Sequence, residues 1–241
     1  MPHVATRIGN RYTGLRAGSV RRAFPGTGLA AGRHADVETV LERSGEIVLF
    51  RRLMRDLIES ASRDRPAPFR RVVDHIRQSA EPIRCVNDLL DELANDSGQD
   101  GLDLGVDVLS QVGGVAIAAV EAFTVADSLA RSRPAKHVEL GTAMPIHDEV
   151  WYMLLRGAAR AADVSDARRL SALIPASKHP SVAVRVSWIE ALGDLYARPG
   201  RGPSRTMVMT RLLAHLREVA RGEKGHPVRD AAGAVLESLG A

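Results

Sequence analysis

Two short segments hold the residue types best able to bind a metal ion. Asp88 and Asp91, within residues 87–92, are three positions apart and so share one helix face. Residues 147–149 read His-Asp-Glu. Neither segment has the partner spacing of a zinc motif such as HExxH or paired CxxC. We therefore expect surface acids on a helix, and acids that complement a helix N-terminus, with no metal or cofactor. An all-α metal-dependent enzyme stays as an alternative.

Other motifs that support catalysis are missing from the chain. Gly26, Gly28 and Gly32 lack the spacing of a dinucleotide-binding loop, and no Lys-Ser or Lys-Thr pair follows them. No GxSxG nucleophile elbow occurs. Cys85, the only cysteine, has no companion motif, and we expect it to be a packing residue. We assign no catalytic residue.

Arginines near the C-terminus form the best candidate for binding. Three of them surround a Pro/Gly-rich loop, and three more are placed on the outward face of a helix expected at residues 204–221: Arg198, Arg201 and Arg205, then Arg211, Arg217 and Arg221. Guanidinium groups can bind phosphates or an acidic protein surface. The alternative is a solvated helix face, partly balanced by nearby acids.

The charge distribution is uneven along the chain. The net charge is +4, but residues 1–35 carry six arginines and no acid, so residues 36–241 have a net charge of −2. We interpret residues 1–35, which are rich in Gly and Arg, as a disordered tail. Arginine outnumbers lysine by 30 to 3, which is typical of a GC-rich bacterial genome. The basic pI therefore does not by itself predict a basic domain surface.

The elements that position these residues are predicted to be helices throughout. Apolar residues recur at helical spacing from residue 36 onward, and no segment alternates as a strand does. We expect helices at 36–60, 69–79, 82–95, 147–161, 165–174, 180–197, 204–221 and 227–239, and a pair within 102–130 that is broken at Gly113-Gly114. Residues 132–145 are expected to be a loop. The predicted fold class is all-α.

Two C-terminal helices share a pattern that repeats after 44 residues. Val184-Arg185, Trp188 and Ala191-Leu192 in the first correspond to Val228-Arg229, Ala232 and Val235-Leu236 in the second, and a His-Pro pair precedes each helix. The first copy resembles the second helix of a HEAT repeat, and the period fits that class. The resemblance covers residues 163–241, and Ile83-Arg84 with Leu90 gives a weaker echo upstream.

The resemblance implies a right-handed α-solenoid of stacked antiparallel helix pairs. It makes residues 36–241 a helical-repeat domain, with degenerate pairs at 36–130, where a globular bundle is the alternative, and HEAT-like repeats at 147–241. Arg185 and Arg229 would then be structural residues that bond across a turn or to a neighbouring repeat. The remaining surface candidates are Glu190 and Asp194. With Ala183, Ser187 and Ala197 they form the solvent-compatible face of the helix expected at 180–197, opposite its apolar face.

We therefore predict a non-catalytic scaffold that binds a protein partner through a curved surface. A helical-repeat protein that binds nucleic acid through its tail and C-terminal arginines is the alternative. A single cysteine and the absence of an apolar leader favour the cytoplasm. Residues 112–126, the most apolar run, are too short to span a bilayer, so no membrane association is expected.

Overall fold

The computed structural model describes residues 35–60, 65–96, 98–132, 147–198, 203–222 and 226–240. These residues form ten α-helices, one 3-10 helix and no strand. The helices are α1 (Ala35–Glu59), α2 (Pro66–Gln78), α3 (Pro82–Asp96), α4 (Gly98–Val112), α5 (Gly114–Ser132), α6 (Asp148–Arg160), α7 (Asp166–Leu173), η2 (Ile174–Lys178), α8 (Val182–Ala197), α9 (Pro203–Ala220) and α10 (Pro227–Ser238). The all-α prediction is confirmed. The tail predicted at residues 1–35 and the loop predicted at 132–145 lie almost wholly outside the described residues.

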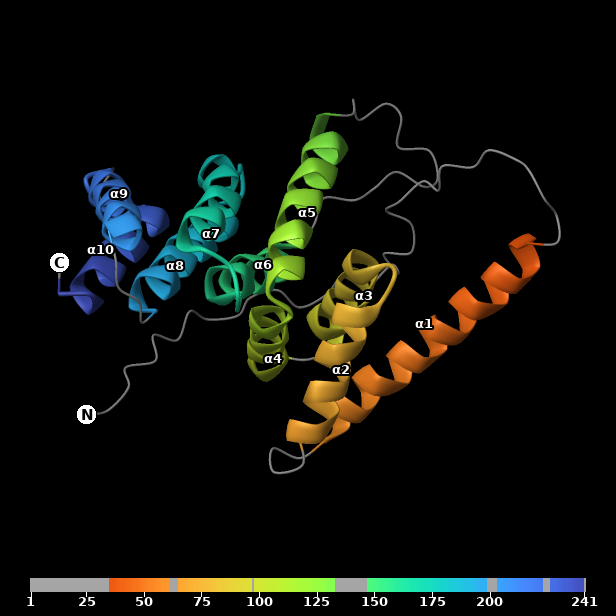
Figure 1. Cartoon of the computed structure of the whole chain (residues 1–241). Helices are drawn as coiled ribbons and strands as arrows, with labels where there is room; N and C mark the ends of the chain where they lie inside the picture. Colours follow the sequence, from red (N-terminus) through yellow and green to blue (C-terminus); the bar gives the residue numbers. More distant parts are fainter. Residues whose placement is uncertain are drawn as a thin grey trace.

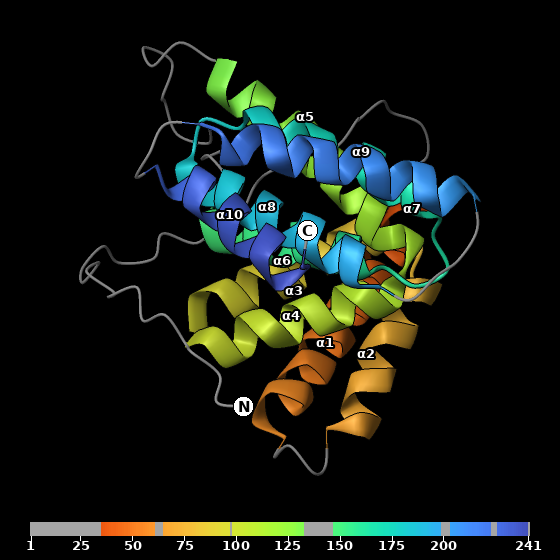
Figure 2. The same ribbon diagram turned by 90° about the vertical axis from the view of Figure 1, so that its left-hand side faces the viewer.

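The helices pack as consecutive pairs that form two rows. Each even-numbered helix contacts the next, from α2 through α4, α6 and α8 to α10, and α3, α5, α7 and α9 form a second chain of contacts. Within each pair, such as α5 with α6 or α7 with α8, the two helices also contact each other. Figure 1 shows the pairs following one another from α1 at one end to α9 and α10 at the other. Figure 2 looks from that second end, with α9 and α10 in front.

Neighbouring even-numbered helices run in parallel. Gly105 of α4 lies against Met153 of α6, and Leu109, one turn later, lies against Gly157. Residue numbers thus rise together along both helices. Between α6 and α8, Arg156 and Arg160 lie in order beside Glu190 and Asp194. Side chains one turn apart on successive helices can therefore form a continuous strip across the row.

A sharp turn joins α4 to α5 at the predicted Gly113-Gly114 break. The two helices are bent by 114°. Gly113 adopts a φ of 65°, a left-handed conformation that favours glycine, and a Cβ there would lie 2.8 Å from the carbonyl oxygen of Ala162. The amide of Ala162 donates to the Ser110 carbonyl at 2.7 Å, which fixes the end of α6 against the end of α4.

One hydrophobic cluster runs the length of the described chain. It extends from Phe50 in α1 to Ala232 in α10 and includes Trp151 and Trp188, each 2% exposed. Both tryptophans are therefore core residues. In the described ranges, no single helix is long and apolar enough to cross a bilayer, although the bent pair α4 and α5 meets the length and composition criteria.

Three local predictions need correction. Helix α2, predicted from residue 69, begins at Pro66, because Pro66 and Pro68 fit its first turn, where the missing N–H costs nothing. Ser187, predicted on a solvent-compatible face, is 7% exposed, because α8 is covered on both sides by α6 and α10. The Ile83-Arg84 echo lies on α3, outside the even-numbered row that contains α8 and α10.

Candidate functional site: a polar strip across α4, α6 and α8

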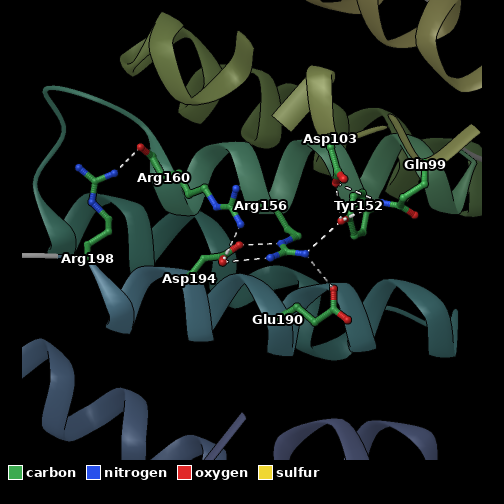
Figure 3. Close-up of polar contacts among 8 residues, drawn as sticks. All are labelled: Gln99, Asp103, Tyr152, Arg156, Arg160, Glu190, Asp194 and Arg198. Atoms are coloured by element: carbon green, nitrogen blue, oxygen red, sulfur yellow. Dashed lines mark hydrogen bonds and ion pairs between the residues drawn. The ribbon is translucent and has the colours of Figure 1, made fainter. Parts of the chain in front are cut away.

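Arg156 of α6 is the centre of a group of polar contacts on the even-numbered row. Its Nε donates to Oδ2 of Asp194 at 2.6 Å and its Nη2 to Oδ1 at 3.0 Å, which makes a bidentate pair with α8. Its Nη1 donates to the Tyr152 hydroxyl at 3.0 Å and lies 3.5 Å from Oε2 of Glu190. Figure 3 shows that the guanidinium lies between the two helices and faces α8.

The contacts continue from Arg156 to α4. The Tyr152 hydroxyl donates to Oδ1 of Asp103 at 3.2 Å. Gln99, one turn before Asp103, donates to the same carboxylate oxygen at 3.1 Å and lies 3.4 Å from the Tyr152 hydroxyl. A ring of hydrogen bonds therefore joins α4 to α6, as Figure 3 shows.

At the other end, the strip reaches the end of α8. Arg160, one turn after Arg156, donates to Oδ1 of Asp194 at 2.9 Å, so this carboxylate accepts from two arginines. Arg198, just after α8, donates to the Arg160 carbonyl. We define the polar strip as the eight residues Gln99, Asp103, Tyr152, Arg156, Arg160, Glu190, Asp194 and Arg198.

Burial makes the centre of the strip rigid and leaves its margins accessible. The side chains of Asp194 and Arg156 are 15% and 21% exposed, whereas those of Arg160 and Glu190 are 37% and 39% exposed. Burial lowers the pKa of Arg156, but the hydrogen bonds and charge of Asp194 hold it above its ordinary value. Burial raises the pKa of Glu190, and Arg156 opposes that shift. Arg156 is therefore held as a cation between α6 and α8, and the carboxylate of Glu190 lies at the more exposed edge of the strip.

The structure separates the predicted surface residues into two groups. Glu190, Asp194 and Arg198 come together in the strip. Arg205 contacts Asp166 and donates to the Tyr196 carbonyl at 3.0 Å and to the Arg198 carbonyl. Two of the six arginines thus hold backbone carbonyls in place, a use that charge counting along the sequence could not reveal.

The other predicted arginines lie apart from the strip. Three of them, Arg211, Arg217 and Arg221, are exposed and belong to α9 or its end, and α9 is in the odd-numbered row. Arg201 lies outside the described residues. The predicted arginine cluster is therefore not one surface within the described part of the chain.

The two repeat arginines have different surroundings. Arg185 donates to the carbonyls of His179 and Pro180, at 2.6 and 3.1 Å, and so satisfies the backbone before α8. Arg229, its counterpart in α10, lies 3.7 Å from the carboxylate of Asp230. The hydrogen bonds of Arg185 across the turn are those that a structural role requires.

A second polar cluster, which the sequence did not reveal, joins α5 to the turn before α8. His179 is 8% exposed, and its Nε2 lies 3.0 Å from Oδ2 of Asp127, which is 4% exposed. Nδ1 of His179 accepts from the Ser181 amide at 3.1 Å, and Nε2 lies 2.9 Å from Nη2 of Arg131 as well, so Asp127 and Arg131 both contact this ring nitrogen. Arg131 donates to the same Asp127 oxygen at 2.6 Å, and Trp151 packs against the His179 ring. Burial lowers the pKa of His179, with Asp127 opposing that shift.

The two acidic segments weighed as metal-binding candidates, residues 87–92 and 147–149, lie near each other. Burial, followed by the charge of Asp88, raises the pKa of Asp91 from 3.8 to about 6, and His147 at the start of α6 opposes both. Asp88 and Asp91 are half-buried and not the fully exposed acids expected. Within the described ranges, no three His, Cys, Asp or Glu side chains are placed to hold a metal ion.

Comparison with known proteins adds no relative to this description. No family model matches the chain, and no curated protein or solved structure matches it. What the chain does must therefore be inferred from its own residues and contacts.

Proposed function

We propose that this chain is a non-catalytic, cytoplasmic scaffold for protein interaction, built as a right-handed α-solenoid of HEAT-like helix pairs. The packing of the helices in two rows, each pair against its neighbours, supports the solenoid interpretation. The 44-residue repeat in α8 and α10 and the contacts of Arg185 support the HEAT-like interpretation.

The observation that carries this proposal is the polar strip. Even-numbered helices that run in parallel carry their polar side chains in register, so the strip extends over α4, α6 and α8. Its interior arginine donates to carboxylates of the chain itself, while Glu190 and Arg160 remain more than a third exposed. A rigid surface with both charges at its edge favours recognition of a folded or extended protein segment.

The test is affinity capture from native lysate with three matched baits. These are the wild-type chain, Glu190→Lys in the strip, and Glu218→Lys on α9, which makes the same charge change on the odd-numbered row. The expected result is a near-stoichiometric partner that the wild type and Glu218→Lys retain and that Glu190→Lys loses. No enriched partner with the wild type, or equal capture by all three baits, would overturn the proposal. Circular dichroism of each bait checks that the helices are intact.

Binding of nucleic acid is the second candidate, because one observation favours it. Arg211, Arg217 and Arg221 are exposed, and their guanidinium groups make no hydrogen bond or ion pair with the described residues. Such arginines can contact phosphates, and their contribution falls as salt rises. Binding to duplex and single strands should be measured across salt, with and without residues 1–35. Binding that is independent of salt, or absent at low salt, would refute this candidate.

A further inference from the structure

A groove lies beside the polar strip, between α2 and α4. It has a volume of about 400 Å³. Arg65, Pro66 and Phe69, at the start of α2, form one wall, and aspartates of α4 form the other. Because α2 and α4 are neighbours in the even-numbered row and Asp103 belongs to both the groove and the strip, the two adjoin each other.

The α4 wall has an excess of negative charge. Asp100, Asp103 and Asp107 are all exposed and line the groove. Asp103 accepts hydrogen bonds from the strip, but the carboxylates of Asp100 and Asp107 make no hydrogen bond or ion pair with any described residue. Three carboxylates and one guanidinium, that of Arg65, line the groove, and the charge of Arg160 on α6 acts on Asp107 from outside the lining. The net charge stays negative, so the groove favours a cation over phosphate.

The α2 wall provides the two other features of a peptide site. The partly exposed Phe69 ring can pack against an aliphatic stem and accept a cation over its face. Nε of Arg65 is buried and finds no hydrogen-bond partner. Because buried donors are nearly always paired, a small shift of this side chain toward a peptide carbonyl would satisfy it.

The spacing of the carboxylates selects the form of the ligand. Asp100 and Asp107 are seven residues apart on one helix face, or roughly 10 Å along the axis. In a polyproline II segment, residues i and i+3 lie on the same side about 9 Å apart. We propose that the groove binds an extended segment of a partner protein that presents two arginine or lysine side chains three residues apart. This inference rests on the proposed scaffold function and names the chemistry of its partner.

The test is fluorescence anisotropy with the full-length chain and labelled hexapeptides at fixed ionic strength. The probe is Pro-Arg-Pro-Pro-Arg-Pro, with Pro-Pro-Arg-Arg-Pro-Pro as the spacing control. The double variant Asp100→Asn/Asp107→Asn should bind the probe about tenfold more weakly. The double variant Asp230→Asn/Glu237→Gln removes two exposed charges from α10 instead, and should bind within about twofold of wild type. Phe69→Leu, which keeps the apolar volume, should also weaken binding.

Three results would overturn the inference. They are unchanged affinity in the α4 variant, equal losses in the α4 and α10 variants, and equal binding of the two peptides. The capture experiment separates this failure from failure of the scaffold itself. A partner lost with Glu190→Lys, in the absence of peptide binding, leaves the scaffold standing and removes the groove. Peptide binding that depends on Asp100 and Asp107, with no captured partner, supports the groove and removes the scaffold.

Discussion

The close approach of α4 and α6 gives the sharpest prediction, the effect of Gly157→Ala. A Cβ at Gly157 would lie 2.4 Å from Cβ of Leu109 and 3.1 Å from its Cδ1. Carbon atoms in contact are normally about 3.5–4.0 Å apart, so the overlap is about 1 Å. Because the nearest atom is fixed to the backbone of α4, no side-chain rotation relieves the overlap. The two helices must separate there, more than one turn from the contact of Asp103 with Tyr152 by which the polar strip joins them.

The magnitude follows from two opposing terms. Overpacking of a core costs about 1–3 kcal/mol, and a clash between two Cβ atoms belongs near the upper end. Alanine is favoured over glycine inside a helix by about 1 kcal/mol, which offsets part of that cost. The net loss in the free energy of unfolding should be about 1–2 kcal/mol. The matched control is Gly233→Ala in α10, where an added Cβ has nothing within 4 Å. That variant should gain about 0.5–1 kcal/mol.

Urea unfolding followed by far-UV circular dichroism measures both variants. The same substitution should thus shift the midpoint in opposite directions at two helical positions. A gain in stability for Gly157→Ala similar to that of Gly233→Ala would refute the close contact between α4 and α6. The register of the strip would then be wrong as well, because that register depends on this approach.

Polar groups outside the groove give further expectations. Asp194→Asn removes the charge that Arg156 and Arg160 share, and should lower the free energy of unfolding by about 2 kcal/mol, with a loss below about 0.5 counting against the network. His179→Ala should cost about 2–3 kcal/mol, because it leaves a void in the core and removes a buried hydrogen bond, whereas His226→Ala, which only removes a cap, should cost about 1. The raised pKa of Asp91 means that the folded state holds this proton more tightly than the unfolded state. Its contribution to stability is present in acid and is lost as the pH rises through about 6. The free energy of unfolding of the wild type should therefore fall over this range, and Asp91→Asn should remove that fall.

The helices could be predicted because their signals are local. Gly113-Gly114 interrupts an apolar run, and only glycine readily adopts the φ of 65° that position 113 requires. His226-Pro227 marks the start of α10, because His226 caps the helix and proline is tolerated in its first turn. All ten predicted helices are present, with bounds shifted by a few residues. Capping, proline and periodicity depend on neighbours along the chain, which a single sequence displays.

The strip could not be predicted, because its contacts join residues far apart in the chain. Arg156 and Asp194 are separated by 38 positions, and their pairing depends on how α6 and α8 are rotated about their axes. Asp194 was placed on a candidate surface from the helical wheel, but a wheel does not show that another helix lies beside that face. Gly157 has the same limitation, since the reason for a glycine there is Leu109, 48 positions away.

The charges left free on α4 and α9 have opposite signs, and this separates the two candidate functions. On α6, Arg156 and Arg160 both donate to Asp194, and the charge of Arg160 also acts on Asp107 of the groove. Asp100 and Asp107 of α4 remain unpaired among the described residues, as do the three exposed arginines on α9 and at its end. We therefore expect a phosphate backbone and a cationic peptide to bind different rows and not to compete for one site. If both functions exist, saturating duplex should leave the affinity for the arginine peptide unchanged. Duplex titrated into the labelled peptide alone corrects for direct binding of arginine to phosphate. Displacement beyond that control would mean that one surface binds both ligands, which contradicts the opposite charges of α4 and α9.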